Sequence, residues 1–389
     1  MKQTASRLFL SLAGYWLSDR AQQAVAFPSP TGLSFSTLGE EQAYRHRFIL
    51  PAVFLDQRCA FFCESMAAPA YLYINGVLAH IHYTPGKPVE FACNDLLQVG
   101  DNQLVIRFVN LPDKDTCPLL PPLNIAAEDW LALAAPLGMP KAGVFATIGI
   151  RTSPWSYIAG CRMGREEGPL TFCLDTVGEL TQLYVFLVDD TGEAVYTGEG
   201  QCHTIPEGLL ATWSPDQPIL YQLEVQAVDN NRLMDHWLLP FGLLAPGSDI
   251  DRDLPILPLE AFCQGQTGPL VQARRGYLRL DGLTQADAYL DLCDQVGQQA
   301  ILDLPPVTVY AQGLKGARRR TLLEKWLRRY GHHPCIQAWG LGENSSGFSA
   351  EDLGAYRALV DRLDPFQRPL LTEPLAKQKV TPTWTNDKY

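Results

Sequence analysis

The pattern of hydrophobic residues changes near residue 244, and this change divides the chain into two kinds of architecture. Before it, short apolar runs alternate with turn residues at regular spacing, which is typical of antiparallel β structure. After it, short apolar strands alternate with amphipathic helical stretches, which is typical of a parallel α/β fold. We therefore expect β-sandwich domains followed by an α/β domain.

The β part divides into two units, residues 1–157 and residues 158–243. Asn75-Gly76 lies between two alternating runs of the first unit and is a strong signal for a tight hairpin. Many short strands of this kind predict a sandwich or jelly roll, with residues 8–17 as its first strand. The second unit, of roughly 85 residues, alternates clearly at 182–188 and matches a small immunoglobulin-like sandwich.

The third unit, residues 244–389, is predicted to alternate strands and helices. Its helices are expected at 287–296, 317–330 and 350–363, and its strands at 277–280, 299–304, 336–341 and 369–371. Ser349 is in the position of an N-cap for the last helix. Gly297 and Gly331 follow the first two helices, where a glycine commonly ends a helix.

The composition excludes several classes of function. Lys+Arg 31 against Asp+Glu 42 gives a net charge of −11, which argues against a general nucleic-acid-binding surface. No apolar stretch approaches the ~20 residues of a membrane span. The ten cysteines show neither the spacing of a zinc site nor that of a disulfide framework, and they are typical of reduced thiols in a cytoplasm. We expect a cytoplasmic protein with no metal and no cofactor.

Seven short motifs occur in a fixed order along the chain. They are Ser11-Leu12-Ala13-Gly14-Tyr15-Trp16, Tyr44-Arg45-His46-Arg47-Phe48, Tyr73-Ile74-Asn75-Gly76, Gly100-Asp101-Asn102-Gln103-Leu104, Trp213-Ser214-Pro215-Asp216-Gln217-Pro218-Ile219-Leu220-Tyr221, Leu292-Cys293-Asp294-Gln295-Val296-Gly297 and His333-Pro334-Cys335-Ile336-Gln337-Ala338-Trp339-Gly340-Leu341-Gly342. In this order they resemble the motifs of glycoside hydrolase family 2, the β-galactosidase and β-glucuronidase group. The resemblance implies a sugar-binding jelly roll over 1–157, an immunoglobulin-like sandwich over 158–243 and a truncated (β/α)8 TIM-barrel-like domain over 244–389.

The resemblance also identifies where the catalytic acid would lie, and the chain departs from the family there. Retaining β-glycosidases use two carboxylates about 5–5.5 Å apart. The family's acid/base is the Glu of an Asn-Glu pair, but Gly342 is followed here by Glu343 and then Asn344. Asn344 occupies the acid/base position, and an amide has no suitable pKa for proton transfer. Glu343 is a displaced candidate that a local bulge would have to re-aim.

The second catalytic carboxylate of the family, its nucleophile, lies on the seventh barrel strand. Residues 244–389 number about 146, against the ~200–250 of a complete barrel, so we expect this strand to be missing. Glu373 is the nearby carboxylate that could substitute, and an ordinary solvated glutamate is the simpler interpretation. An open barrel leaves strand edges unpaired, which predicts a homo-oligomer or a protein partner that covers them.

Three further residues are candidates for substrate binding, each with a simpler alternative. Asp303 ends a predicted strand, where it would line a sugar site or cap a turn. Trp339 would be a sugar platform or a core residue. His333 would contact substrate or act as the family's structural histidine before Pro334. His80 and His82 follow the predicted hairpin and are expected on an exposed strand.

We therefore expect a catalytically inactive relative of family 2 that acts as a carbohydrate-binding or scaffold protein, with a glycan as its possible ligand. Two alternatives remain open. One is an active retaining β-glycosidase that uses Glu343. The other is one chain of a split glycosidase that a partner subunit completes.

Overall fold

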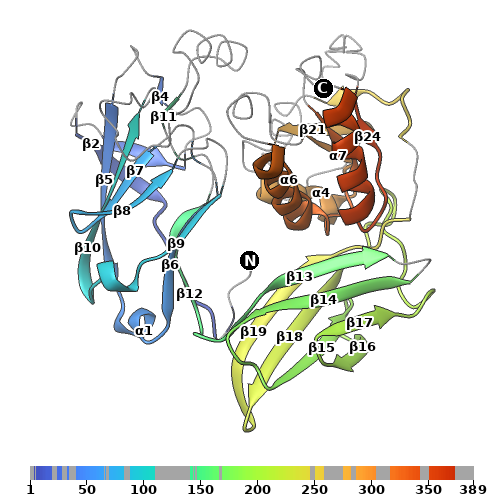
Figure 1. Ribbon diagram of the computed structural model, residues 1–389, viewed down its shortest axis with the longest axis horizontal. Helices are drawn as coiled ribbons and strands as arrows, with labels where there is room; N and C mark the ends of the chain where they lie inside the picture. The colour runs from blue at the N-terminus through green and yellow to red at the C-terminus, as the bar shows by residue number, and fades with distance from the viewer. Residues whose placement is uncertain are drawn as a thin grey trace, which may run out of the picture.

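A computed structural model gives the structure of the chain. Within the residues that it describes, the chain forms two antiparallel β-sandwiches followed by a parallel sheet with helices (Figure 1). The described residues are 4, 6–19, 24–28, 33–34, 41–64, 66, 70–82, 88–109, 141–142, 144, 147–165, 169–245, 250–257, 275–281, 286–303, 316–341 and 350–372.

The first sandwich packs a four-stranded sheet against a six-stranded sheet. The strand orders are β1(Phe9–Ser11)–β12(Ile148–Ser153)–β6(Arg58–Cys63)–β9(Val89–Ala92) and β3(Ala24–Phe27)–β2(Gly14–Ser18)–β5(Glu41–Leu50)–β10(Gly100–Val109)–β7(Ala70–Ile74)–β8(Val77–His82); the shorter elements are α1(Ala52–Leu55), η1(Asn94–Leu96), β4(Leu33–Ser34) and β11(Lys141–Ala142). Trp16 and Tyr44 from one sheet meet Phe61 and Ile150 from the other in a shared core. The alternation of buried and outward residues along each strand produces this two-layer arrangement.

The local signals in this sandwich were informative to different degrees. The predicted hairpin is confirmed: β7 pairs with β8, and Asn75 and Gly76 have φ of 50° and 84°. The predicted single strand over 8–17 is wrong, because these residues form β1 and β2 in different sheets. Gly14, with φ of 138°, begins β2 after the change of sheet, and Leu12 and Trp16 are both buried in the core.

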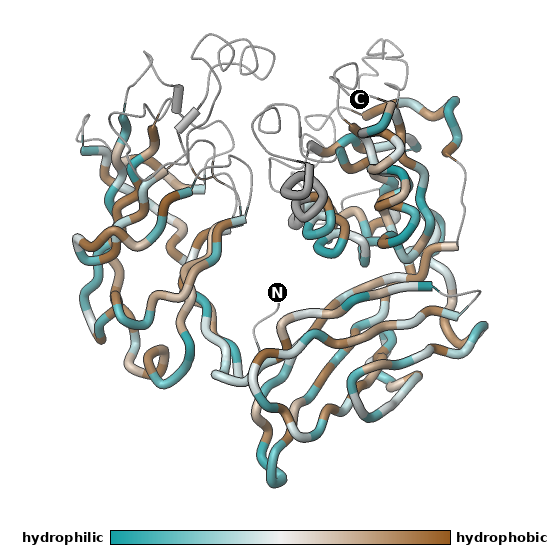
Figure 2. Tube along the Cα trace, in the orientation of Figure 1, coloured by the Kyte–Doolittle hydropathy of each residue, from teal (hydrophilic) through white to brown (hydrophobic). Residues whose placement is uncertain are grey.

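The second sandwich packs a three-stranded sheet against a four-stranded sheet. The orders are β13(Tyr157–Arg165)–β14(Leu170–Val177)–β17(Cys202–Ile205) and β16(Ala194–Glu199)–β15(Gln182–Val188)–β18(Tyr221–Asp229)–β19(Arg232–Phe241). Hydrophobic and hydrophilic positions alternate along the strands of both sandwiches (Figure 2). The predicted boundaries at 157 and 243 stay predictions, although β13 begins and β19 ends close to them.

One pair of cysteines departs from the expectation. Cys173 on β14 and Cys202 on β17 are directly opposite each other and form a disulfide, so the expectation of reduced thiols is wrong for this pair. A separation of 29 residues gave no local pattern that would have indicated the bridge. The predicted cytoplasmic location stays a prediction.

The third unit is a five-stranded sheet whose strands run parallel in chain order. Its elements are β20(Ile256–Leu257), β21(Tyr277–Asp281), α4(Ala286–Val296), β22(Ala300–Asp303), α6(Gly316–Tyr330), β23(Ile336–Gly340), α7(Ala350–Leu363) and β24(Leu370–Leu371). The predicted parallel strand–helix alternation is confirmed, with helix bounds within one residue of those expected. A continuation of this sheet into a barrel stays a prediction. None of the described helices is long and apolar enough to cross a membrane.

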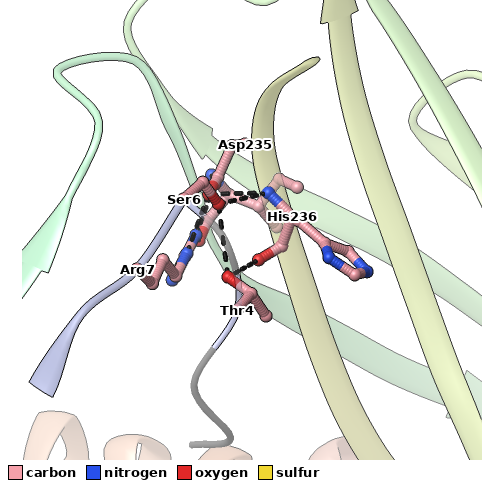
Figure 3. A network of polar contacts seen from close by, with 6 residues as sticks. Thr4, Ser6, Arg7, Asp235 and His236 are labelled. Atoms are coloured by element: carbon pink, nitrogen blue, oxygen red, sulfur yellow. Dashed lines mark hydrogen bonds and ion pairs between the residues drawn. The ribbon is translucent and has the colours of Figure 1, made fainter.

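A buried ion pair joins the residues before β1 to the second sandwich (Figure 3). Both nitrogens Nε and Nη2 of Arg7 donate to the carboxylate of Asp235, and Nη2 also donates to the Ile158 carbonyl. The Ser6 hydroxyl donates to the same carboxylate, and the Thr4 hydroxyl donates to the His236 carbonyl. The chain before β1 is therefore anchored on β13 and β19 as well as on its own sandwich.

The second sandwich also contacts the α/β unit directly. Trp213 donates its indole N–H to the Asp294 carbonyl at 2.8 Å and is part of the α/β core. Gly297 has φ of 77°, and a Cβ there would lie 2.2 Å from the Pro215 carbonyl oxygen. The predicted helix-ending role of Gly297 is thus confirmed, and the same glycine allows the close approach of the two units.

Candidate functional site

A charged pair joins two adjacent parallel strands: Asp303 ends β22, and Arg279 lies two residues before the end of β21. Arg279 on β21 donates from Nε and Nη2 to the two carboxylate oxygens of Asp303 on β22, at 2.9 and 3.1 Å. The side chains are 22% and 13% exposed, so the pair is mostly buried but reaches solvent. Ligands of parallel α/β folds bind at this end of the sheet. Asp303 therefore lies at the end of the sheet where a ligand of such a fold binds.

The space for this pair depends on the third strand. Gly340 on β23 is the register partner of Asp303, and a Cβ on Gly340 would lie 1.9 Å from Asp303 Oδ1. The carboxylate therefore occupies the volume that any side chain at this position would need. Three neighbouring strands thus form the site: β21 contributes the cation, β22 the carboxylate, and β23 a glycine that leaves space for the carboxylate.

We expect the Gly340→Ala substitution to break the pair. Asp303 must turn away from the new methyl group and lose its two hydrogen bonds from Arg279, which costs about 1–3 kcal/mol. The measurement is the free energy of unfolding from urea denaturation. Gly354→Ala in α7 is the matched control: nothing lies within 4 Å of its Cβ, and alanine there is expected to stabilise the helix by up to about 1 kcal/mol. Equal stability of Gly340→Ala and the parent chain would contradict the prediction.

Beneath the pair, the same side of the sheet is apolar. On each of the three strands, the residue two positions earlier faces the same side of the sheet. These residues are Tyr277, Ile301 and Ala338, and they form a small core. Residues from 250 to 256 pack against them. Residues of the chain itself thus cover this face in the part of the sheet that the structure describes. A ligand at the strand ends would contact this apolar cluster and, beside it, the polar Arg279–Asp303 pair.

Trp339 lies on the opposite side of the sheet. It is fully buried in the core between the sheet and the helices, where the guanidinium of Arg368 stacks 4.8 Å from its ring. A sugar cannot reach a ring in this position. The structure therefore favours the core interpretation of Trp339 over the sugar platform.

His333 lies before β23, at the amino end of the sheet and away from the Arg279–Asp303 pair. It is buried, and its Nδ1 is 2.6 Å from Asp294 Oδ2, while Asp294 Oδ1 accepts from the Cys335 amide at 3.0 Å. Residues at this end of parallel α/β sheets serve stability more than chemistry. The position favours the structural role of His333, and its role in substrate binding stays a prediction.

The same residues form a group with the donor types of a metal site. Single ligand atoms of Asp291, Asp294 and His333 lie within 4.8 Å of one another. However, both oxygens of Asp294 already accept hydrogen bonds from His333 and Cys335. A cation would have to displace the contacts that hold the start of β23, so the donor set fits a structural cluster better than a metal site.

The remaining sequence candidates are divided between described and undescribed residues. Glu343, Asn344 and Glu373 lie outside the described residues, and their predicted roles stay predictions. His82 is buried, which corrects the expectation that it lies on an exposed strand, because it faces the core side of β8. His80 is half-buried and stacks on Phe91 at 4.9 Å.

Sequence reasoning missed Arg279 as a partner of Asp303, since the two residues are 24 positions apart. A partial signal was present, because the two residues lie in strands that were predicted to be neighbours in a parallel sheet. The role of Gly340 had no signal of this kind. A glycine in a strand indicates a bulge or a close approach, but does not say what approaches.

Comparisons with known proteins give distant relatives of one kind. No protein-family model matches the chain. A β-glucuronidase of Paenibacillus borealis is 22% identical over 91% of this chain and 68% of its own length. A β-galactosidase of Thermoanaerobacter pseudethanolicus is 27% identical over 35% of this chain and 21% of its own length. The solved Ruminococcus gnavus β-glucuronidase in complex with an N1-substituted uronic isofagomine superposes with a TM-score of 0.71, at 17% identity, over 95% of this chain and 74% of that structure.

Proposed function

We propose that this chain, a divergent protein of the glycoside hydrolase family 2 type, binds a carbohydrate without hydrolysing it. The observation that carries the proposal is the engagement of Asp303. Both of its oxygens accept from Arg279. Among the strand-end residues whose side chains the structure describes, Asp303 is the one carboxylate. It is half of a hydrogen-bonding pair with Arg279. We propose that this pair binds sugar hydroxyls.

The chemistry of hydrolysis supports the inactive half of the proposal. A retaining glycosidase needs a nucleophilic carboxylate and a second carboxyl group that donates and then accepts a proton. The reversed order Glu343-Asn344 puts an amide where the family has its proton donor. Asp303 is not a substitute, because both of its oxygens already accept hydrogen bonds from Arg279.

The Arg279–Asp303 pair has the donors and acceptors that a sugar requires. A guanidinium has five N–H donors, and two of the nitrogens here donate to Asp303, so further donors remain for a ligand. The carboxylate retains lone pairs that accept from hydroxyl groups. The relatives named above are β-glucuronidases and a β-galactosidase. We therefore propose a uronic or neutral hexose, in β linkage, as the sugar.

A split or complemented enzyme is the second candidate, because the described sheet has two open edges. β20 and β24 each pair with a single strand among the described residues. Exposed edges of parallel strands are usually covered by further chain or by a partner. For this second candidate we propose that a second copy of this chain or a partner subunit covers the edges at β20 and β24.

Hydrolysis and binding should be measured together on the purified chain. We expect no turnover of nitrophenyl β-glucuronide or β-galactoside above that of Glu343→Gln. We expect D-glucaro-1,5-lactone, which is bound in a structure of the Ruminococcus gnavus enzyme, to bind in calorimetry. Asp303→Asn is expected to weaken that binding at least about tenfold, the effect of losing a hydrogen bond to a charged group. Asp190→Asn, at an exposed turn of the second sandwich, is the matched control and should bind normally.

The other outcomes point to different functions. Turnover that disappears in Glu343→Gln would contradict the proposal and make Glu343 a working acid/base. Turnover that appears only on addition of a partner subunit would favour the split enzyme. Neither turnover nor binding, with normal thermal unfolding, would leave a scaffold protein.

A further inference from the structure

The Cys173–Cys202 disulfide lies on the solvent-facing side of its sheet. Along β14, Leu170, Phe172 and Leu174 face the core of the second sandwich, whereas Cys173 lies between them on the other side and is half-exposed. Cys202 is exposed. The bridge therefore connects two strands of one sheet at the surface, unlike the buried bridges that join the two sheets of antibody domains.

The strand that the disulfide holds is short and at an edge. β17 has four residues and pairs with β14 alone among the described residues. The preceding strand, β16, belongs to the other sheet, so the chain crosses between sheets at Gly200 and Gln201. The disulfide fastens β17 immediately after this crossing. Besides the bridge, β17 is held by its backbone pairing and by the buried side chains of His203 and Ile205.

A positive charge lies beside the disulfide. Arg162 on β13 is the register partner of Cys173, which is in turn the partner of Cys202. Directly opposite residues of antiparallel strands lie on the same side of the sheet, so these three side chains form one row on the outward face. Arg162 also donates to Asp175 at 2.8 Å, and both side chains of this ion pair are about half-exposed. A neighbouring cation stabilises a thiolate and makes its sulfur a better leaving group.

We propose that Cys173–Cys202 is a reversible redox site that exchanges with low-molecular-weight thiols. A small thiolate attacks Sγ of the exposed residue Cys202, the S–S bond breaks, and Cys173 leaves with the electron pair as a thiolate beside Arg162. A second small thiol then attacks the mixed disulfide and releases Cys202. Two small thiols are oxidised to one small disulfide, and their two protons end on the two cysteines. Reduction frees β17 from its covalent link to β14.

This inference concerns the second sandwich and is independent of sugar binding. It is tested on the folded chain with mixtures of reduced and oxidised glutathione at slightly alkaline pH. After quenching with acid, free thiols are alkylated and located by peptide mapping. We expect Cys173 and Cys202 to be protected at first, to become labelled together at millimolar reduced glutathione and to be protected again by oxidised glutathione.

Two buried thiols provide an internal reference. Burial raises the pKa of Cys59 to about 11 and that of Cys93 to about 12, so both should stay unlabelled throughout. Labelling of Cys173 and Cys202 before reduction would overturn the disulfide itself. Resistance of the folded chain to millimolar glutathione would overturn the exchange and leave a purely structural cross-link.

The charge in the row is tested separately by the rate of reduction. We expect Arg162→Gln to slow reduction about threefold, because the departing Cys173 thiolate loses its neighbouring positive charge. Asp175→Asn, which removes the carboxylate beside Arg162, is expected to speed it. Arg45→Gln, in an exposed ion pair of the first sandwich, is the matched control. An unchanged rate in Arg162→Gln would overturn the role of Arg162.

The consequence for β17 is read from thermal unfolding. The double variant Cys173→Ser/Cys202→Ser should melt at the same temperature as the reduced parent chain, several degrees below the oxidised chain. A double variant that melts with the oxidised chain would overturn the proposed loosening of β17.

Discussion

Substituting asparagine for Asp235 is expected to lower the free energy of unfolding of the second sandwich by about 3–5 kcal/mol. The reason is the charge that remains: Arg7 is 4% exposed and would stay buried without its counter-ion. The amide also cannot accept all the hydrogen bonds from Arg7, Ser6 and the Ile158 amide that converge on the carboxylate. Urea denaturation followed by tryptophan fluorescence measures the loss.

An exposed ion pair is the matched control for this substitution. Asp19 pairs with Arg45 at 2.9 Å, but the side chains are 38% and 42% exposed. Asp19→Asn should therefore change the stability by less than about 1 kcal/mol. Similar losses for the buried and exposed pairs would show that Arg7 stays solvated in solution, in contradiction to its position between β13 and β19.

Substituting lysine for Arg368 is expected to cost at least about 3 kcal/mol, although the charge is kept. The buried guanidinium of Arg368 donates to the Asp364 carboxylate and to the carbonyls of Gly331, His333 and Ile336. A lysine ammonium has three donors and no planar fork, so it cannot satisfy these acceptors together. The measurement is the unfolding midpoint of the α/β unit, with Arg362→Lys as control, since Arg362 lies in an exposed pair with Glu324.

The Arg368 substitution also has a structural readout. The hydrogen-bond partners of Arg368 lie at the amino ends of β23 and β24. The carboxyl ends of these two strands adjoin the candidate site. We expect weaker lactone binding in Arg368→Lys even at temperatures where the variant is folded. Unchanged stability in Arg368→Lys would contradict the prediction, because it would mean that the carbonyls find other donors.

The sequence predicted those parts of the fold that depend on near neighbours. The Asn75-Gly76 hairpin and the helix end at Gly297 follow from backbone conformations that few residues adopt, so local composition was sufficient. The prediction of one strand over residues 8–17 was wrong because of the tertiary structure. Their run of hydrophobic residues looks continuous, but it is divided between β1 and β2 in different sheets, with the buried Leu12 between them, and no local pattern distinguishes one strand from two.

The candidate site was predicted less completely, because its geometry is set between strands. Asp303 was found, since a carboxylate at a strand end has a known meaning. Arg279 and Gly340 were not assigned to it, because their roles appear only when three strands are in register. Trp339 shows the converse: its strand position was right, but a strand has two sides, and in a sheet buried on both faces the sequence does not distinguish them.

The anchoring of Arg7 has a consequence for the order of events during synthesis. Asp235 follows Arg7 by 228 residues, so a ribosome adding ~5–20 residues per second makes the anchor's partner roughly 10–50 s after the anchor itself. During that interval the first sandwich can assemble, while Arg7 still lacks its counter-ion. The residues before β1 are thus made well before the strand that completes their anchoring, and they reach their final place late.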